Sequence, residues 1–481
     1  MKPFALWLVL LLNLAYIVVG YPSVIELNDV SQSTTVTKRK SYAGYKLLRT
    51  EPLTTGNVPV FRNLEDVHGI NYWTYPLENR SLDIFTSPKQ LSRVQGVLKD
   101  LGLDHDVVFH DAEEIMHYEQ PPQAKAKQLV WEDDAQNTAE PSDVSYQSEN
   151  ATGQDMPPTG TTRAVAPDFF NRYQRYNAIM NFASQLAREN PSTVSFQSIG
   201  RSYEGKDMGI LKIATGGSKP GIFIDGGMHA REWISPATVT YIMNKLVNDP
   251  KSKPLTDMFD WYIVPIVNVD GYEYTHTNDR YWRKTRSRSS NGCYGVDPNR
   301  NFGFHWAESG SSNKPCSDIY HGPKAFSEVE TQNLGRTILY LKDKLKLYLT
   351  FHAYSQMWLV PWGFAKSQKP QDYNELVRLA TVGKNALERT YGTRYSVGTA
   401  PDLLYPAAGG SDDWAKGAAG IPYSYCLELR DKGRYGFALP ANQIKATGEE
   451  TFNAVAAVAQ ELYRTLKKKE QPFTNADNES D

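Results

Sequence analysis

The chain has 481 residues, of which 40% are hydrophobic and 22% are charged, and its formal net charge is −2. This composition excludes a disordered or fibrous protein, and the length suggests two or three domains of roughly 150 residues each. A nearly neutral chain has no general field that would attract nucleic acid or an anionic membrane, so neither is expected as a partner. Function must therefore be sought in a local site.

The N-terminus carries an apolar segment of about the length of a signal sequence. Lys2 precedes the apolar run, and Val18 and Gly20 provide the small side chains that a signal peptidase accepts. The pattern predicts a signal peptide over residues 1–20 and secretion into the extracellular space. A membrane anchor is the alternative, but the run is shorter than the ~20 apolar residues of a spanning helix.

Residues 21–118 are predicted to hold a small domain that begins after an irregular stretch to about Arg39. Strand-like patterns occur at 42–50, 70–76, 81–87 and 105–111, with a helical pattern at 57–69. A second helix is indicated by apolar residues at helical spacing, namely Leu91, Val94, Val97, Leu98 and Leu101. The resulting βαββαβ order predicts a ferredoxin-like α+β domain.

Residues 119–163 form a predicted linker. Its middle part is acidic, lacks lysine and arginine, and is too polar to bury a core. Arg163 ends this segment at a position where a trypsin-like protease could cut, and Lys125 or Lys127 offers a second exposed site. The segment could be an ordinary interdomain linker or the point at which an N-terminal domain is removed.

Residues 164–470 are predicted to form one large α/β domain, followed by a flexible tail at 471–481. Helical patterns alternate with apolar strand-like runs, which predicts a mixed, mostly buried β-sheet with helices on both faces. His229, His352 and Glu428 follow or end three such runs. This is the edge at which open α/β sheets bind their ligands.

The chain has three cysteines, so at least one of them has no partner within it. Cys293 and Cys316 enclose a short loop, and a disulfide there would contribute on the order of 3 kcal/mol in an oxidising compartment. Cys426 is then the odd cysteine. It lies two residues before Glu428, so its thiol is expected on the same strand face, in a cleft where mercurials could inhibit.

A pair of potential metal ligands occurs in the segment "HARE", where His229 and Glu232 are three residues apart. Such spacing places both side chains on one side of a helical turn, although one pair alone is a weak signal. His352 is the best candidate for a third ligand. Two histidines, one carboxylate and an open fourth position are typical of a hydrolytic zinc site.

The sequence around these residues resembles the zinc metallocarboxypeptidases of the pancreatic procarboxypeptidase A/B type and is closer to carboxypeptidase B. The resemblance covers nearly everything after the predicted signal peptide. It is carried by motifs in the family's order, namely "IGRSYEGKDM", "GGMHAREWISPA", "RYWRKTRS", "GVDPNRNF", "YHGPKAFSEVE", "HAYSQ", "GGSDDW" and "ELRDKGRYGF". The segment "YAGYKLLR" is similar to the family's activation domain, which implies an inactive precursor inhibited by its own N-terminal domain.

The resemblance implies roles for five residues of the catalytic centre. His229, Glu232 and His352 would bind one zinc ion, and Glu428 would be the general base. Arg283 would stabilise the oxyanion of the tetrahedral intermediate.

The resemblance also implies how the end of a peptide is recognised. Asn299 and Arg300 would hold the terminal carboxylate, Tyr405 would close over it, and Arg231 would contact the substrate further along. A guanidinium binds a carboxylate with two parallel hydrogen bonds, so these residues favour an exopeptidase that acts on peptide or protein C-termini.

Specificity is expected to depend on Asp412, whose position is similar to the base of the side-chain pocket in the B-type enzymes. Gly363 and Ala400 would leave space for a long basic side chain, so release of C-terminal Lys or Arg is predicted. The simpler alternative is that Ser411 or Asp412 only caps a helix. The alternatives for function are an A-type preference for aromatic or aliphatic ends, or a secreted binding protein without catalysis.

Overall fold

The computed structural model describes residues 39–120 and 168–470, except residues 69 and 290. The predicted signal peptide, most of the predicted linker with Lys125, Lys127 and Arg163, and the predicted tail lie outside the described residues.

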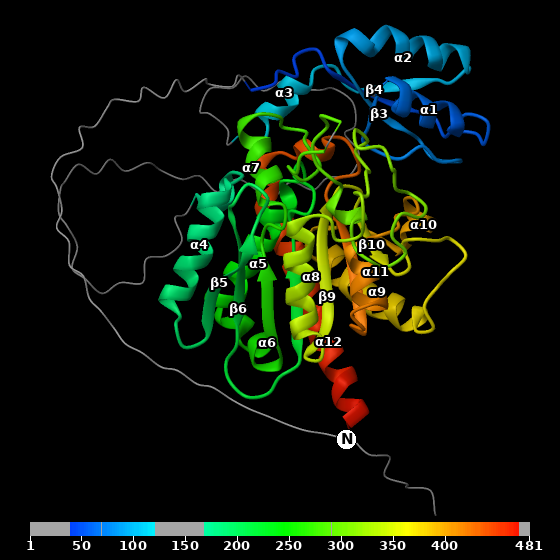
Figure 1. Ribbon diagram of the computed structural model, residues 1–481. Helices are drawn as coiled ribbons and strands as arrows, with labels where there is room; N and C mark the ends of the chain where they lie inside the picture. The colour runs from blue at the N-terminus through cyan, green and yellow to red at the C-terminus, as the bar shows by residue number, and fades with distance from the viewer. Residues whose placement is uncertain (1–38, 69, 121–167, 290, 471–481) are drawn as a thin grey trace, which may run out of the picture. The chain divides into compact units, whose positions relative to one another are not determined.

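The N-terminal domain has the predicted βαββαβ order and is followed by one short helix (Figure 1). Its elements are β1 (Lys46–Thr50), α1 (Val58–His68), β2 (Asn71–Tyr72), β3 (Asp83–Thr86), α2 (Pro88–Asp100), β4 (His105–Phe109) and α3 (Ala112–His117). The antiparallel sheet has the order β2-β3-β1-β4. The ferredoxin-like expectation is confirmed, although the second strand is only two residues long.

Helix α2 shows why this domain folds as the pattern predicts. Pro88 occupies the start of the helix, where its fixed φ is favourable and its missing N–H costs no hydrogen bond. Val94 and Leu98 lie one turn apart and are buried in a core that also contains Leu48 and Phe61. The small domain therefore has a hydrophobic core of its own.

The second domain is built on a mixed sheet of eight strands in the order β11-β10-β12-β9-β7-β8-β6-β5. The strands are β5 (Val194–Arg201), β6 (Asp207–Ile213), β7 (Gly221–Asp225), β8 (Asp260–Val264), β9 (Leu345–Ala353), β10 (Met357–Val360), β11 (Ser396–Thr399) and β12 (Tyr423–Leu429). The four central strands β12, β9, β7 and β8 are parallel to their neighbours within that group. They are almost entirely buried, as expected for strands covered on both faces.

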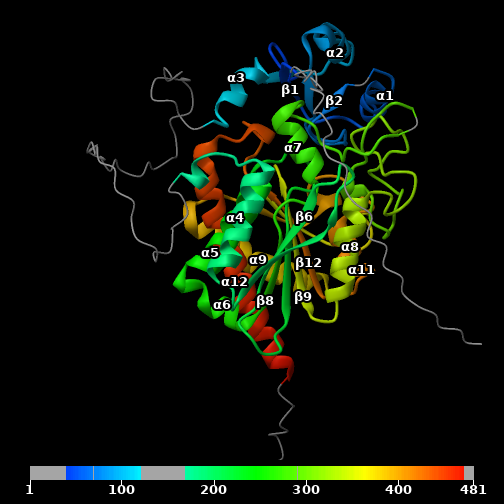
Figure 2. The same cartoon turned by 60° about the vertical axis from the view of Figure 1, so that its left-hand side comes forward.

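Helices cover both faces of this sheet (Figures 1 and 2). The α-helices are α4 (Tyr176–Glu189), α5 (Ile234–Asn248), α6 (Lys253–Met258), α7 (Val269–Thr277), α8 (Val329–Leu341), α9 (Tyr373–Tyr391), α10 (Ala400–Leu403), α11 (Ser411–Gly417) and α12 (Ile444–Glu470). Helix α12 packs against α5 and α9 on one face, whereas α8 and α11 cover the other. The predicted α/β architecture is confirmed.

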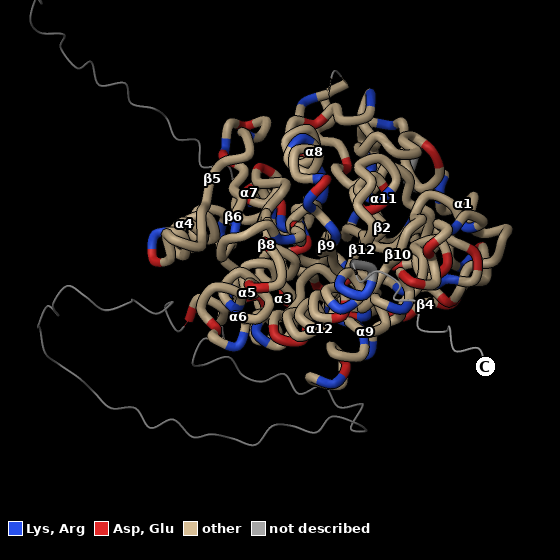
Figure 3. Tube along the Cα trace, turned by 90° about the horizontal axis from the view of Figure 1, so that it is seen from below, with Lys and Arg blue, Asp and Glu red and all other residues tan. Residues whose placement is uncertain are grey.

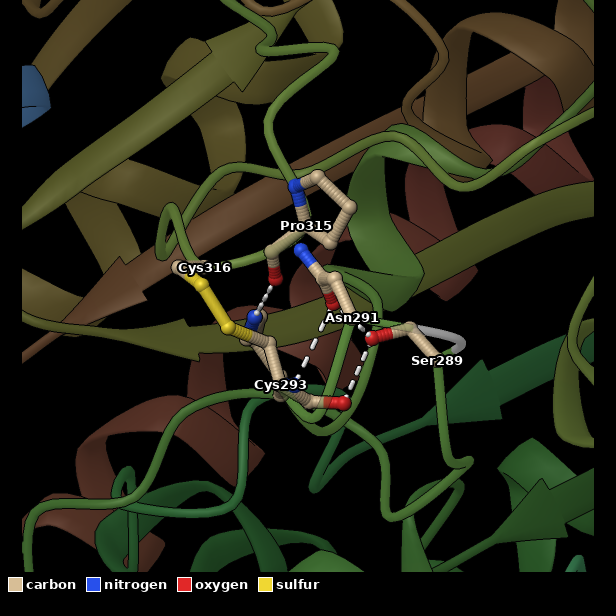
Figure 4. The surroundings of a disulfide bond; sticks show 6 residues. Ser289, Asn291, Cys293, Pro315 and Cys316 are labelled. Atoms are coloured by element: carbon tan, nitrogen blue, oxygen red, sulfur yellow. Dashed lines mark hydrogen bonds between the residues drawn. A yellow bond between two sulfur atoms is a disulfide. The ribbon is translucent and has the colours of Figure 1, made fainter.

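Cys293 and Cys316 form a disulfide in a loop region of the second domain (Figure 4). The hydroxyl of Ser289 donates to the carbonyl oxygen of Cys293 at 2.6 Å, and the amide of Cys293 donates to the Asn291 side chain at 3.2 Å. The predicted bridge is therefore present, in a loop that is also held by local hydrogen bonds.

Lys and Arg positions are interspersed with Asp and Glu positions along the described part of the chain (Figure 3). Among the described residues, no helix is both long enough and apolar enough to cross a membrane.

Candidate active site

Three neighbouring parallel strands bring the predicted metal ligands and the predicted base to one edge of the sheet. His229 and Glu232 lie in the turn between β7 and α5, His352 lies near the end of β9, and Glu428 lies near the end of β12. Glu428 pairs directly with His352 in the register of β12 and β9. Glu428 and His352, which are 76 positions apart in the sequence, are thus held side by side by backbone pairing.

The turn after β7 depends on a glycine. Gly227 has φ +63°, a left-handed conformation that most side chains disfavour. A Cβ atom at this position would lie 3.0 Å from the side chain of Pro236 and 3.2 Å from the Cα atom of Ile266. The close approach lets the chain reverse directly after β7, so that His229 and Glu232 face the end of β9.

The three predicted metal ligands converge at this edge and are buried. The Nδ1 atom of His352 lies 3.1 Å from the Nδ1 atom of His229 and 3.1 Å from Oε2 of Glu232. The Nδ1 atom of His229 lies 2.7 Å from Oε1 of Glu232. Two imidazole nitrogens and a carboxylate are the donor set of many catalytic zinc sites.

The outer nitrogens of both histidines also fit a metal site. The Nε2 atom of His229 lies 3.0 Å from Asp297, and that of His352 lies 3.3 Å from the hydroxyl of Thr350. When Nε2 donates its proton to such a partner, Nδ1 is left free to bind a metal. The backbone amide of Ala353 donates to Glu232 at 3.1 Å and fixes the third ligand.

Electrostatics at the site depend strongly on burial. Burial would raise the pKa of the Glu232 carboxyl, but the two histidines outweigh this effect and lower it. Burial, together with the nearby Glu232, raises the pKa of Glu428 to about 8. A carboxyl group with a pKa close to neutrality is well suited to accept a proton and return it within one catalytic cycle.

Arg283 reaches the site through Asp297, a residue that the sequence reasoning missed. The guanidinium of Arg283 donates to Oδ2 of Asp297 at 2.8 Å, while Oδ1 of Asp297 faces His229. Burial would raise the pKa of Asp297, but Arg283 and His229 hold that pKa well below its usual range. In the sequence, Asp297 precedes Pro298 and resembles an ordinary helix cap, a role that it also fills towards Asn299.

One nitrogen of the Arg300 guanidinium has no hydrogen-bond partner among the described residues. Its Nε donates to the carbonyl oxygen of Gly310 at 2.7 Å and its Nη1 to that of Asn299 at 2.8 Å, whereas its buried Nη2 has no partner. The side-chain oxygen of Asn299 accepts from the Ser411 amide at 2.9 Å, which leaves its amide nitrogen to donate elsewhere. The ring of Tyr405 lies 5.8 Å from the Arg300 guanidinium.

The adjacent residues Asp412 and Asp413 have different environments. Asp413 is buried and accepts hydrogen bonds from the backbone amides of Gly363 and Phe364, so it has a structural role. Asp412 is only partly buried, and Gly410 rather than Asp412 is the N-terminal cap of α11. The carboxylate of Asp412 accepts from the amides of Asp412 and Asp413 in the first turn of α11, although burial raises its pKa.

Cys426 lies beside the predicted specificity pocket. It is buried in a small apolar cluster with Leu359 and Ala400. Burial, followed by the negative charge of Glu428, raises the pKa of the Cys426 thiol well above its usual value. The thiol therefore stays protonated, which agrees with packing rather than with a nucleophile.

Family profiles match both domains of the chain. The profile described as "Zinc carboxypeptidase" covers residues 179–454, and one described as "Carboxypeptidase activation peptide" covers residues 48–119. The chain belongs to the zinc carboxypeptidase family.

Individual relatives agree with this assignment. The chain is 52% identical to carboxypeptidase B of Astacus astacus over 291 residues, which are 60% of this chain and 96% of the relative. It is 47% identical to zinc carboxypeptidase A 1 of Anopheles gambiae over 62% of this chain and 70% of the relative. The structure of carboxypeptidase A from Helicoverpa armigera is similar at a TM-score of 0.75 and 27% identity, over 89% of this chain and 99% of that structure.

This zinc carboxypeptidase is therefore an enzyme made with an activation propeptide, and zinc is its cofactor. His229, Glu232 and His352 form a group that can bind the ion. The expectations of a metallocarboxypeptidase and of a precursor form are confirmed.

The activation propeptide contributes to the walls of the active-site pocket. Trp73 and Thr74, which follow β2, line it together with residues of the catalytic domain, namely His229, Glu232, Arg283, Ala353, Tyr354, Ser355, Leu404, Tyr405, Glu428 and Phe437. The hydroxyl of Tyr354 donates to Asp83 in β3 at 2.7 Å. Side chains of the propeptide thus occupy space beside the catalytic groups.

Two arginines of the catalytic domain lie close to the propeptide. Arg280 is fully buried, and its Nε donates to Glu119 at 2.8 Å. Arg231 lies 4.1 Å above the ring of Phe437 and 3.4 Å from Asp318, which also accepts a hydrogen bond from Asn71 of the propeptide. Glu119 and Asp83 were not singled out from the sequence, where they resemble ordinary surface and strand residues.

Proposed function

We propose that this chain is the secreted precursor of a B-type carboxypeptidase that releases Lys or Arg from peptide C-termini. Residues 21–118 would be the activation domain, 119–163 the linker that is cut near Arg163 by a trypsin-like protease, and 164–470 the catalytic domain. The proposal combines the activation propeptide with the environment of one residue, Asp412.

In the proposed reaction, zinc held by His229, Glu232 and His352 supplies a Lewis acid that activates water and polarises a carbonyl. Glu428 accepts a proton from the attacking water and passes it to the departing amine. The Arg283 guanidinium, oriented by Asp297, stabilises the oxyanion that forms from the scissile carbonyl.

Recognition of a chain end is assigned to Arg300 and Asn299, with Tyr405 and Arg231 as further substrate contacts. The unpartnered Nη2 of Arg300 supports this role, because a buried donor without a partner is costly unless a ligand satisfies it. An internal peptide segment would bring no carboxylate to this donor. The arrangement therefore favours removal of single C-terminal residues over internal cleavage.

Specificity for basic side chains follows from the contrast between Asp412 and Asp413. Asp413 accepts from the backbone amides of Gly363 and Phe364 in another segment. The backbone partners of Asp412 are instead the amides of Asp412 and Asp413 themselves, and its carboxylate is partly exposed and close enough to Arg300 for their charges to interact. A carboxylate beside the site that binds a terminal carboxylate would pair with a Lys or Arg side chain. The small residues Gly363 and Ala400 support the same assignment, as does the similarity to a carboxypeptidase B.

The test compares the release of C-terminal Arg and Phe from otherwise identical peptides. The full chain is treated with trypsin, and kcat/KM is measured for the wild type, Asp412→Asn and Asp412→Leu, with a zinc chelator as the control. We expect the wild type to prefer Arg. Both variants should lose about 30-fold or more in kcat/KM for Arg, because an interfacial charge pair typically contributes 2 kcal/mol or more.

The rate at which C-terminal Phe is released distinguishes a B-type from an A-type preference. Release of Phe should stay constant or increase in Asp412→Leu, which shows that the variant is folded and that its zinc site is active. If the wild type releases Phe faster than Arg, the enzyme has an A-type preference, as the similarity to a zinc carboxypeptidase A 1 would allow.

A further inference from the structure

Asp225, the last residue of β7, is a fully buried carboxylate outside the proposed catalytic set. Among the described residues, no lysine or arginine forms an ion pair with it. It accepts two hydrogen bonds, from the hydroxyl of Tyr348 at 2.6 Å and from that of Thr350 at 2.7 Å. Because burying a carboxylate without a cation is costly, its presence in the core needs an explanation.

The hydrogen bonds around Thr350 have only one consistent direction. An ionised carboxylate can only accept, so the Thr350 hydroxyl must give its single proton to Asp225. The oxygen of Thr350 can then only accept from the Nε2 atom of His352, which lies 3.3 Å away. His352 thus holds a proton on Nε2, and its Nδ1 atom, which faces His229 and Glu232, is the nitrogen that would bind a metal.

Backbone pairing fixes this chain of groups. Asp225 pairs with Thr350 in the parallel register of β7 and β9. Tyr348, Thr350 and His352 alternate along β9, so their side chains lie on one face of the strand. The contacts therefore follow from strand register rather than from flexible side chains.

His229 has a simpler version of the same arrangement. Its Nε2 atom lies 3.0 Å from the carboxylate of Asp297, without an intervening hydroxyl. Both histidines of the proposed metal site thus have a buried carboxylate behind their outer nitrogen, one in direct contact and one through Thr350. Such partners fix the tautomer and orientation of a ligand histidine.

We propose that Asp225 is a positioning residue for His352 and acts through the hydroxyl of Thr350. This inference rests on the proposed role of His352 as a zinc ligand. Loss of an outer partner of this kind typically lowers metal affinity by about 10- to 100-fold. A loss in this range is expected whenever the path through Thr350 is broken.

The experiment measures the zinc dissociation constant of the full chain by competition with a chromophoric chelator. Thr350→Val keeps the shape of the side chain and removes the hydroxyl, whereas Thr350→Ser retains the hydroxyl. Asp225→Asn removes the carboxylate. Tyr348→Phe is the matched control, because it removes a hydrogen bond from the same carboxylate without interrupting the path to His352. Thermal unfolding of each zinc-free protein reports on stability separately.

We expect Thr350→Val and Asp225→Asn to raise the zinc dissociation constant about tenfold or more, with Thr350→Ser and Tyr348→Phe within about threefold of the wild type. The inference is overturned if Thr350→Val binds zinc like the wild type, or if Tyr348→Phe weakens zinc as much as Thr350→Val does. His352→Ala tests the underlying assignment. If that variant keeps full affinity, His352 is not a ligand and the inference falls with it.

Discussion

At the scale of single residues, Asp297 connects several parts of the proposed catalytic centre. One of its carboxylate oxygens faces His229 and accepts from the backbone amide of Asn299, and the other accepts from Arg283. His229 as a proposed metal ligand, Arg283 as the proposed oxyanion-stabilising cation and the loop proposed to hold the terminal carboxylate therefore share one buried anion. A change at Asp297 should disturb all three functions together.

Glu428 is proposed to act as the general base, a role that substitution can test. Glu428→Gln keeps the size of the side chain but cannot take up a proton, so kcat for peptide hydrolysis should fall by about 10²- to 10⁴-fold. Steady-state kinetics of the trypsin-treated chain measure this loss. Zinc content should stay at the wild-type level, because Glu428 is outside the group of three converging ligands. A variant that retains more than a tenth of the wild-type kcat would remove Glu428 from this role.

The sequence predicted single residues well where a local motif surrounds them. His229 and Glu232 occur in one short segment and His352 at a strand end, and the family motifs around them turned a weak spacing signal into a ligand prediction. Asp297, Asp225 and Glu119 could not be found in this way, because their partners lie 14 to 161 positions away. Such contacts depend on strand register and domain packing, which no local pattern contains.

At the scale of elements, periodicity predicted the order of helices and strands better than their ends. The pattern of an element is determined by the side chains that it buries. Examples are the apolar spacing in α2 and the apolar runs of β7, β9 and β12. The second strand of the activation domain is much shorter than the alternating pattern suggested, since only Asn71 and Tyr72 pair with β3. Side-chain alternation alone does not reveal how long a neighbouring strand is.

Helix α8 carries a buried acid that should make the stability of the protein depend on pH. Glu330 is fully buried near the start of the helix, and its Oε1 atom accepts from the backbone amide of Tyr203 at 2.9 Å. Burial, with smaller contributions from Glu328 and Asp270, raises the pKa of Glu330 from 4.5 to about 7. Between pH 4.5 and about pH 7, Glu330 therefore keeps its proton in the folded protein, whereas the unfolded chain has lost it.

The sign of the pH effect follows from this difference. Below about pH 4.5 the group is protonated in both states, and its contribution to stability is fully present. Between pH 4.5 and 7 the unfolded state loses its proton first, so stability falls as the pH rises, by about 3 kcal/mol at most. Glu330→Gln cannot ionise and should lack this loss.

Thermal unfolding of the full chain between pH 5 and pH 8 measures the effect. The melting temperature of Glu330→Gln minus that of the wild type should increase from pH 5 to about pH 7 and level off towards pH 8. Glu114→Gln, at an exposed position, is the control and should show no such trend. A difference that is constant from pH 5 to pH 8 would mean that Glu330 is already ionised in the folded protein at pH 5.

At the scale of the whole molecule, a few polar contacts join the activation propeptide to the catalytic domain. Asp83 accepts from Tyr354 of the catalytic domain and from Arg49 of its own domain, and Glu119 pairs with Arg280. Arg280 also donates to the carbonyl oxygens of Arg231 and Phe437. Because Phe437 lines the active-site pocket, these contacts lie close to the catalytic groups.

The Glu119–Arg280 pair should control how firmly the propeptide inhibits the enzyme. Both side chains are buried, and removing one partner of a buried ion pair typically costs 3–5 kcal/mol, because the remaining charge has lost its compensation. In Glu119→Ala, release of the propeptide would return Arg280 to water and relieve this cost. The uncleaved chain should therefore show at least about tenfold more activity towards a small peptide than the uncleaved wild type.

Glu114→Ala, at an exposed position of α3, is the matched control and should keep the low activity of the wild type. After trypsin treatment the three proteins should have equal kcat/KM, since the propeptide no longer limits access. An uncleaved Glu119→Ala protein as inactive as the wild type would show that inhibition depends on the contacts of Trp73, Thr74 and Asp83 instead.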